Sequence, residues 1–178
     1  MSDFSKEYAR ALYDLCKEEN LTEEVLGELL VIDTLIKENK EYKNLLDTPA
    51  ISLNDRLGII EEAFSSCLLY VKNFIKLLAE NKMFFEFSSC VLEFNKIYDK
   101  ENNIERAEAI TCVPLSDEQI TNLREKIEKI ISKKVYITNK VDESIIGGVI
   151  LKLNNKMYDG SIRKSLNEIA CKIKSNTL

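Results

Sequence analysis

The sequence predicts an α+β protein in two parts, a bundle of helices over residues 1–104 and a small α+β domain over residues 105–178. Up to Asn103, apolar residues recur with the 3.6-residue period of amphipathic helices, and no strand pattern appears. After residue 104 the period shifts toward 2, and β-branched segments alternate with turn residues. With 5 Gly, 2 Pro and 31% charged residues, the composition favours a folded, helix-rich chain over a disordered one.

The first part contains six segments with a helical pattern. The first has one apolar stripe: Phe4, Tyr8, Ala11, Leu12 and Leu15. The second begins near Thr22, a possible N-cap, and has the stripe Val25, Leu29, Ile32 and Ile36. A short third helix is expected from Tyr42 to Leu46, before Pro49. Short connections between such helices favour an antiparallel bundle.

Two further helices complete the regular pattern of the bundle. Ser52 caps the fourth, with Asp55 at the third helical position, and the stripe that follows is Leu53, Leu57, Ile60 and Phe64. The sixth helix starts near Phe84 and has the stripe Phe84, Phe87, Val91, Phe94 and Tyr98.

The fifth helix, Cys67 to Glu80, has more apolar residues than one core-facing stripe needs. One stripe is sufficient to reach the core: Val71, Phe74, Ile75 and Leu78. A second stripe lies on an adjacent face: Tyr70, Asn73 and Leu77. The surplus indicates either a central helix buried on all sides or a groove that receives a partner's amphipathic helix, and the pattern leaves both open.

The second part reads as a small sheet with two helices. Strands are predicted over Ala107 to Val113, Val135 to Val141 and Gly148 to Leu153, with a short strand at Met157 and Tyr158 after the turn pair Asn154-Asn155. Ser116 and Gln119 form a capping box before a helix with the stripe Ile120, Leu123, Ile127 and Ile130. A final helix is expected after Asp159 and Gly160, with Ile162, Leu166, Ile169 and Ile173 on one face.

Residue types exclude several kinds of chemistry. The chain has no His, so histidine-based triads and HExxH zinc sites are absent. Its five cysteines are at least 22 residues apart, which favours free thiols over a redox pair or metal site: Cys16, Cys67, Cys90, Cys112 and Cys171. The pair Gly147-Gly148 lacks a GxGxxG context and precedes a strand, so we interpret it as a bulge or a close backbone approach. No catalytic, cofactor-binding or metal-ligating residue is predicted.

Charge and hydropathy restrict the environment and the partners. Residues 1–104 carry 12 basic against 20 acidic residues (net −8), and residues 105–178 carry 13 against 10 (net +3). This argues against nucleic-acid binding, and indicates either two ordinary solvated surfaces or two domains with different partners. The longest charge-free stretch, Ala63 to Val71, has nine residues, and the first ten residues lack the apolar core of a signal peptide. We therefore expect a soluble protein inside the cell with no membrane insertion.

Four motifs, in order along the whole chain, carry a resemblance. They are the opening Tyr8-Ala9-Arg10-Ala11-Leu12-Tyr13-Asp14-Leu15, the stretch from Phe74 to Met83, the Pro114-Leu115-Ser116 turn, and Val141 to Ile150 followed by Asp159-Gly160-Ser161-Ile162-Arg163. Together they resemble the delta subunit of F-type ATP synthases, a family that includes the mitochondrial oligomycin-sensitivity-conferring protein.

The resemblance implies a six-helix N-terminal bundle, a smaller α+β C-terminal domain and a non-catalytic function. Such a subunit is a stator that joins the catalytic head to the peripheral stalk and resists rotor torque during proton- or sodium-driven ATP synthesis. The implied partners are the alpha and also the beta subunits of the head and the b subunits of the stalk, with one copy per complex. No cofactor is implied, and the implied location is peripheral, on the cytoplasmic face of a bacterial cell membrane.

The resemblance also implies two contact regions. The head alpha subunit's N-terminal helix would bind between the first and fifth helices, at Tyr8, Ala11, Leu15, Tyr70, Asn73 and Leu77. The stalk would contact the C-terminal motif, represented by Asp142, Gly147, Gly148, Asp159, Gly160 and Arg163. The alternative function is a helical adaptor unrelated to ATP synthase, and a carboxylate enzyme is disfavoured because no convergent acids are apparent.

Overall fold

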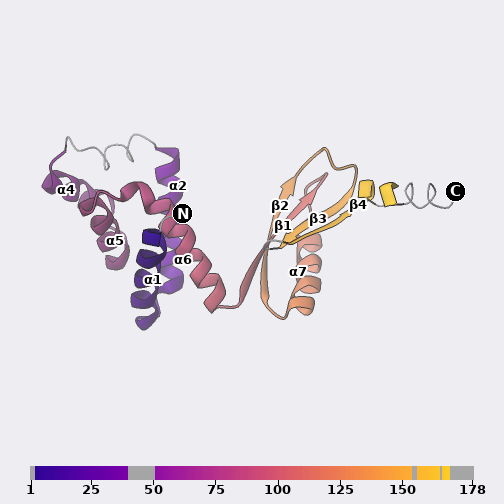
Figure 1. Ribbon diagram of the computed structural model, residues 1–178, viewed down its shortest axis with the longest axis horizontal. Helices are drawn as coiled ribbons and strands as arrows, with labels where there is room; N and C mark the ends of the chain where they lie inside the picture. Colours follow the sequence, from indigo (N-terminus) through magenta and orange to yellow (C-terminus); the bar gives the residue numbers. More distant parts are fainter. Residues whose placement is uncertain (1–2, 40–50, 154–155, 165, 169–178) are drawn as a thin grey trace. The chain divides into compact units, whose positions relative to one another are not determined.

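The computed structural model describes residues 3–39, 51–153, 156–164 and 166–168. The chain divides into two compact units, Met1–Tyr98 and Asp99–Leu178, and each is described by itself. Figure 1 shows helices throughout the first unit and a sheet with helices in the second. The chain is thus α+β, as the sequence predicts.

Five α-helices and one short 3-10 helix precede the sheet within the described residues. They are α1 (Asp3–Glu18), α2 (Thr22–Glu38), α4 (Leu53–Ala63), α5 (Leu69–Glu80), η1 (Phe84–Glu86) and α6 (Phe87–Glu101). The expected helix from Tyr42 to Leu46 lies outside the described residues, so a six-helix bundle stays a prediction. None of the described helices is long and apolar enough to cross a bilayer.

Aromatic side chains fill the core of the first unit. The rings of Phe84 and Phe87 stack with centroids 5.6 Å apart, and Tyr13 of α1 meets Phe94 of α6 edge-on at 5.5 Å. The α2 stripe and the core stripe of α5 are buried as predicted: Val25, Leu29, Ile32, Ile36, Val71, Phe74, Ile75 and Leu78. The 3.6-residue period therefore predicted the core-facing side of these helices correctly.

The apolar stripe predicted on α1 only partly coincides with its core face, although Phe4 and Tyr8 are partly buried against the core. The buried residues of α1 are Ser5, Ala9, Leu12, Tyr13 and Cys16. Of the predicted stripe only Leu12 is among them, whereas Ala11 and Leu15 are exposed. Two adjacent faces of α1 carry apolar residues, and a period alone does not tell which one meets the core.

In the first unit, capping was predicted correctly at one helix and wrongly at another. The Ser52 side chain accepts a hydrogen bond from the Asp55 backbone N–H at 3.2 Å, so it caps α4 as expected. Thr22, the expected N-cap of α2, is its first helical residue; the capping position is Leu21, which makes no side-chain cap.

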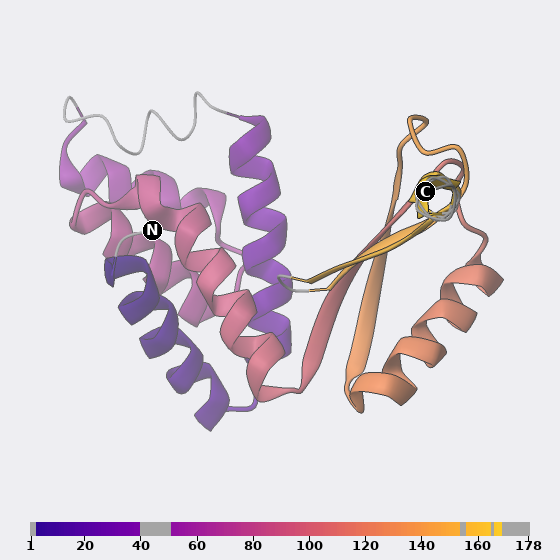
Figure 2. The same ribbon diagram turned by 45° about the vertical axis from the view of Figure 1, so that its right-hand side comes forward.

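The second unit is built on a four-stranded sheet of order β2-β1-β3-β4. Its strands are β1 (Ile104–Thr111), β2 (Lys134–Val141), β3 (Gly148–Leu153) and β4 (Lys156–Ser161). Strand β1 pairs in parallel with β2 and antiparallel with β3, and β3 pairs antiparallel with β4. Figure 2 shows α7 (Asp117–Ile131), the β1–β2 crossover helix, running along the sheet.

A capping box starts α7 as predicted, with the Ser116 side chain on the Gln119 backbone N–H and the Gln119 side chain on the Ser116 N–H. The α7 face that meets the sheet contains Leu123, Ile127 and Ile131. Ile130, which the sequence predicted on this face, is instead 82% exposed. Ile130 and Ile131 both fit the helical period after Ile127, and Ile131 is the one that packs against the sheet.

The last strand is longer than predicted. Asp159 and Gly160, expected before a helix, belong to β4 and pair with Ile150 and Val149 of β3. Helical residues follow at 162–164 and 166–168, so the expected final helix begins within the described part. The turn pair Asn154-Asn155 lies outside the described residues.

Candidate functional site: a groove between α1 and α5

Polar contacts fix α5 at both of its ends. The Leu68 backbone N–H, at the N-cap of α5, donates to the Glu28 carboxylate of α2 at 2.9 Å. Near the other end, the buried Arg56 guanidinium of α4 donates to the Ala79 carbonyl at 3.1 Å. Both groups satisfy backbone atoms that a helix terminus leaves without an intrahelical partner. They hold α5 in place without using the face that looks away from the core.

A third link ties α4 to the middle of α5. The Glu61 carboxylate of α4 accepts from Lys72 at 3.0 Å and also from Lys76. These hydrogen bonds keep the pKa of Glu61 below its ordinary range. Because Lys72 and Lys76 point to α4, the surplus stripe of α5 stays clear of charge.

On α1, packing against the core fixes the orientation of the helix. Ala9 and Cys16 are completely buried, and burial raises the pKa of the Cys16 thiol to about 11. At the start of the helix the Phe4 and Tyr8 rings stack with centroids 4.0 Å apart. The face next to this packed one carries Tyr8, Ala11 and Leu15 at i, i+3 and i+7.

An open groove of about 510 Å³ lies between α1 and α5. All six residues at which the resemblance implies a head contact line it: Tyr8, Ala11, Leu15, Tyr70, Asn73 and Leu77. None of the six is buried in the chain; Leu15 is 52% and Leu77 is 42% exposed. The surplus stripe of α5 is therefore a groove wall, so α5 is not buried on all sides.

The shape of the groove suits a helix. From Tyr8 to Leu15 the wall on α1 covers two helical turns, about 10 Å. Ala11, at the middle of this wall, has the smallest side chain there and leaves room for close approach. Leucines and tyrosines on the two walls offer the apolar contact that an amphipathic helix buries in such grooves.

Three lining residues were not predicted: Glu7, Leu12 and Phe74. Leu12 and Phe74 are each 5% exposed and form the floor, where the core reaches the groove. In the sequence both belong to apolar stripes. The helical period alone does not separate a residue that faces only the core from one that also reaches the groove. Glu7 is exposed and adjoins Tyr8, and its position beside the stripe was the available signal.

The C-terminal motif forms a hydrogen-bonded turn between β2 and β3. Its first residue, Asp142, donates its backbone N–H to Thr111 of β1 at 2.8 Å, and its carboxylate accepts from the Ser144 N–H at 2.9 Å. The Ser144 hydrogen bonds keep the pKa of Asp142 below its ordinary range. Ile145 is buried, whereas its neighbour Ile146 is 69% exposed.

The glycines of this motif allow β3 and β4 to approach closely. Gly148 has φ +87°, and a Cβ there would lie 2.4 Å from the Gly160 carbonyl oxygen. Gly147 accepts a hydrogen bond from the Ile162 N–H at 3.0 Å. The close backbone approach expected at the glycine pair is thus present.

The other two motif residues have different environments. The Asp159 carboxylate accepts from the Ser161 N–H at 2.9 Å, which keeps the pKa of Asp159 low. Arg163 is exposed. Five of the six motif residues therefore shape this end of the sheet, and the exposed apolar side chains beside them are Ile146, Ile162 and Leu166.

Within the described residues, no three Cys, Asp or Glu side chains gather as a metal site requires. An open apolar groove and a sheet end with exposed apolar residues are features of surfaces that bind other proteins.

Comparisons with known proteins identify the family. The profile of the family described as ATP synthase delta (OSCP) subunit matches residues 4–173. The chain is 31% identical over 168 residues to the ATP synthase subunit delta of Clostridioides difficile, covering 93% of each chain. It is 32% identical over 165 residues to the sodium ion specific ATP synthase subunit delta of Ilyobacter tartaricus, covering 93% of this chain and 95% of that one. The chain belongs to the ATP synthase delta (OSCP) subunit family.

A solved structure shows the same fold. A chain of the Toxoplasma gondii mitochondrial ATP synthase hexamer superposes with a TM-score of 0.72 at 19% identity, covering 97% of this chain and 98% of that one. Members of the family are non-catalytic subunits of the peripheral stalk of ATP synthase, a peripheral part of the membrane-bound complex. The family assignment confirms the resemblance, and it disfavours the unrelated adaptor and the carboxylate enzyme.

Proposed function

We propose that this subunit bridges the catalytic head and the peripheral stalk of an F-type ATP synthase as a stator. The groove between α1 and α5 receives the amphipathic N-terminal helix of a head alpha subunit, and the second unit binds the b subunits of the stalk. A single observation supports the head contact most directly: the groove gathers all six expected residues from two helices, five of them with apolar or aromatic side chains and none of them buried.

The same proposal covers the remaining features of the subunit. One copy per complex, on the cytoplasmic face of the membrane, holds the head against rotor torque, with the beta subunits as further neighbours. A six-helix N-terminal bundle ending near residue 104 separates the head contact from the stalk contact. The stator function requires slow dissociation at both contacts and no chemistry.

The head contact is tested with a peptide of the alpha subunit's N-terminal residues from the same organism. Leu77→Asp places a charge on an exposed groove wall, so folding is retained while apolar contact with the peptide is lost. Burying a Leu side chain contributes about 1.5–3 kcal/mol, so affinity is expected to fall roughly ten- to a hundredfold. Ala11→Asp is expected to lower the affinity in the same way, because the larger side chain keeps the peptide helix away from α1.

The matched control is Leu35→Asp on α2, where the leucine is 51% exposed and lies outside the groove. This variant should bind the peptide like the wild type. The circular dichroism spectrum and the melting temperature should be unchanged in Leu77→Asp, Ala11→Asp and Leu35→Asp. Equal affinity of Leu77→Asp and Leu35→Asp for the peptide would refute the groove as the head contact.

For the stalk contact we propose the end of the sheet that carries the C-terminal motif. The net charge of +3 over residues 105–178 suits acidic partner segments. Because Gly148 shapes the sheet, Gly148→Asp would alter folding of this unit together with stalk binding; the exposed Ile146 separates the two effects. Ile146→Asp should weaken binding of a soluble stalk b subunit with the sheet intact, and unchanged binding would contradict this placement.

A further inference from the structure

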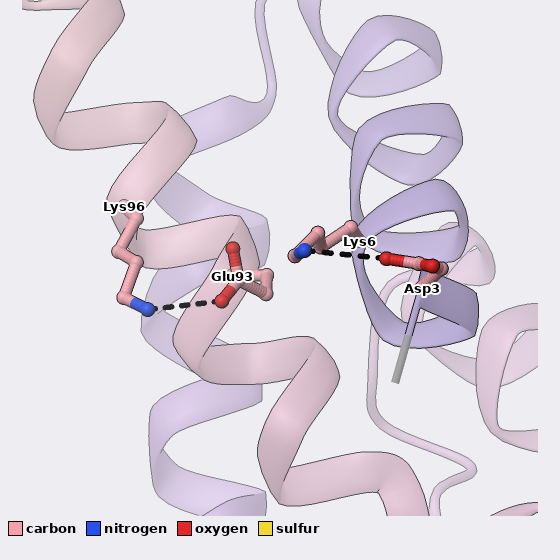
Figure 3. Close-up of polar contacts among 4 residues, drawn as sticks. All are labelled: Asp3, Lys6, Glu93 and Lys96. Carbon is pink, nitrogen blue, oxygen red and sulfur yellow. Dashed lines mark hydrogen bonds and ion pairs between the residues drawn. The ribbon is translucent and has the colours of Figure 1, made fainter. Parts of the chain in front are cut away.

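The wall of the groove contains two polar side chains without a partner among the described residues. Within residues 3–39, 51–153, 156–164 and 166–168, the Glu7 carboxylate of α1 makes no ion pair or hydrogen bond, and the Asn73 amide of α5 makes no hydrogen bond. The basic residues nearest to Glu7 in sequence are engaged elsewhere: Lys6 pairs with Asp3 at 3.3 Å, and Arg10 donates to Asp14 at 3.1 Å. Figure 3 shows the Lys6–Asp3 pair on α1, and the Glu93–Lys96 pair on α6.

A helix that fills the groove removes water from both groups. A buried carboxylate or amide without a new partner is destabilising, whereas a charge-assisted hydrogen bond offsets the lost hydration. The first 104 residues carry a net charge of −8, which adds a longer-range preference for basic partners. A wholly apolar helix, or one with acidic residues at its edge, is therefore disfavoured.

We propose that Glu7 and Asn73 select the occupant of the groove: an amphipathic helix with Lys or Arg flanking its apolar stripe at Glu7, and an amide or hydroxyl group facing Asn73. This inference rests on the proposed head contact and deepens it, because it states which helices the groove accepts. Glu7 favours a basic residue at the edge of the bound helix, and Asn73 fixes where a polar side chain of that helix must lie. The tyrosines and leucines supply the apolar contacts that determine affinity. Selectivity of this kind arises as much from rejection of wrong partners as from attraction to the right one.

The test uses three synthetic amphipathic helical peptides with one Leu/Ile stripe, whose flanking positions are all Lys, all Gln or all Glu. Their binding to the full-length chain is measured by isothermal titration calorimetry at 50 and 300 mM salt. The wild type should bind the Lys peptide about tenfold more tightly than the Gln peptide and bind the Glu peptide most weakly. Higher salt should reduce these differences, because edge charges are screened.

Variants separate the effect of Glu7 on peptide preference from the effect of the overall net charge. In Glu7→Gln the affinities for the Lys and Gln peptides should differ by no more than about twofold. In Glu7→Lys the Gln peptide should bind more tightly than the Lys peptide. The matched control, Glu18→Gln, removes the same charge from the last residue of α1, which does not line the groove, and should keep the wild-type preference. Asn73→Leu should strengthen binding of a peptide whose stripe is apolar throughout and weaken binding of one with Gln facing position 73.

The outcomes distinguish this inference from the proposal on which it rests. If all three peptides bind equally and Leu77→Asp abolishes binding of each, the groove is a helix site but Glu7 does not select the occupant. If Glu7→Gln and Glu18→Gln lower the preference equally, overall charge alone sets it and the inference is overturned. Binding of no peptide, together with no binding of the native alpha-subunit peptide, would overturn both.

Discussion

Substitution of Gly148 by Ala tests whether the second unit depends on close packing of β3 against β4. At φ +87° an L-residue adopts a strained backbone, which costs about 1–2 kcal/mol. The added Cβ would also lie 2.4 Å from the Gly160 carbonyl oxygen and 3.0 Å from the Ser161 Cα, both of which are backbone atoms that cannot rotate away. Overpacking of this kind costs about 1–3 kcal/mol. The free energy of unfolding of the second unit should therefore fall by roughly 2–5 kcal/mol.

The assay is hydrogen exchange measured by mass spectrometry across a urea series, because it reports each unit separately. Amides of β1 and β3 should lose protection at lower urea in the variant, while those of α2 and α6 keep theirs. Gly27→Ala is the matched control: Gly27 lies inside α2 with no atom within 4 Å of an added Cβ, so the change should stabilise the first unit by about 0.5–1 kcal/mol. Unchanged protection of β3 in Gly148→Ala would refute the close approach.

Three further predictions concern thiols, acid and nucleotide. Burial raises the pKa of Cys16 to about 11 and that of Cys90 to about 12, so at pH 8 iodoacetamide should label both only after denaturation; labelling in the native chain would contradict their burial. The pKa of Asp142 and of Asp159 is lowered in the folded chain, so the stability they contribute is present above their ordinary value of 3.8 and is lost as pH falls below it. The melting temperature of the second unit should fall less steeply between pH 4 and 2 when both are replaced by Asn. An equal pH dependence in the variant and the wild type would contradict the turn hydrogen bonds. The isolated chain should neither bind nor hydrolyse ATP, and phosphate release that co-elutes with the protein would contradict its non-catalytic role.

The sequence predicted the elements of the fold better than the faces of its helices. Strand composition and turn residues identified all four strands, although β1 spans Ile104–Thr111 and not Ala107 to Val113. The turn chemistry of Ser52, Ser116 and Gln119 located two helix starts, since these signals are local. The extent of β4 could not be predicted, because Asp159 and Gly160 suit a turn and are drawn into the strand only by pairing with β3. On α7 the choice between Ile130 and Ile131 depends on the position of the sheet.

The groove shows a similar division between local and tertiary information. An apolar surplus on α5 predicted that one stripe would remain after the core was filled, and the structure places that stripe on a groove wall. The core face of α1 could not be predicted, because Ala9, Tyr13 and Cys16 compete with Tyr8, Ala11 and Leu15 as an apolar stripe. Glu7 belongs to no apolar pattern, so its place beside Tyr8 was the one local signal, and the packing of two helices brings it to the groove.

The proposed stator function requires that one chain hold head and stalk at the same time through two separate surfaces. Native mass spectrometry of the full-length chain with the alpha-subunit N-terminal peptide and a soluble stalk b subunit tests it directly. We expect a ternary complex with one copy of this chain. The Leu77→Asp variant should lose only the peptide, and the Ile146→Asp variant should lose only the stalk subunit. Mutually exclusive binding of the two partners, or loss of both from either variant, would contradict it.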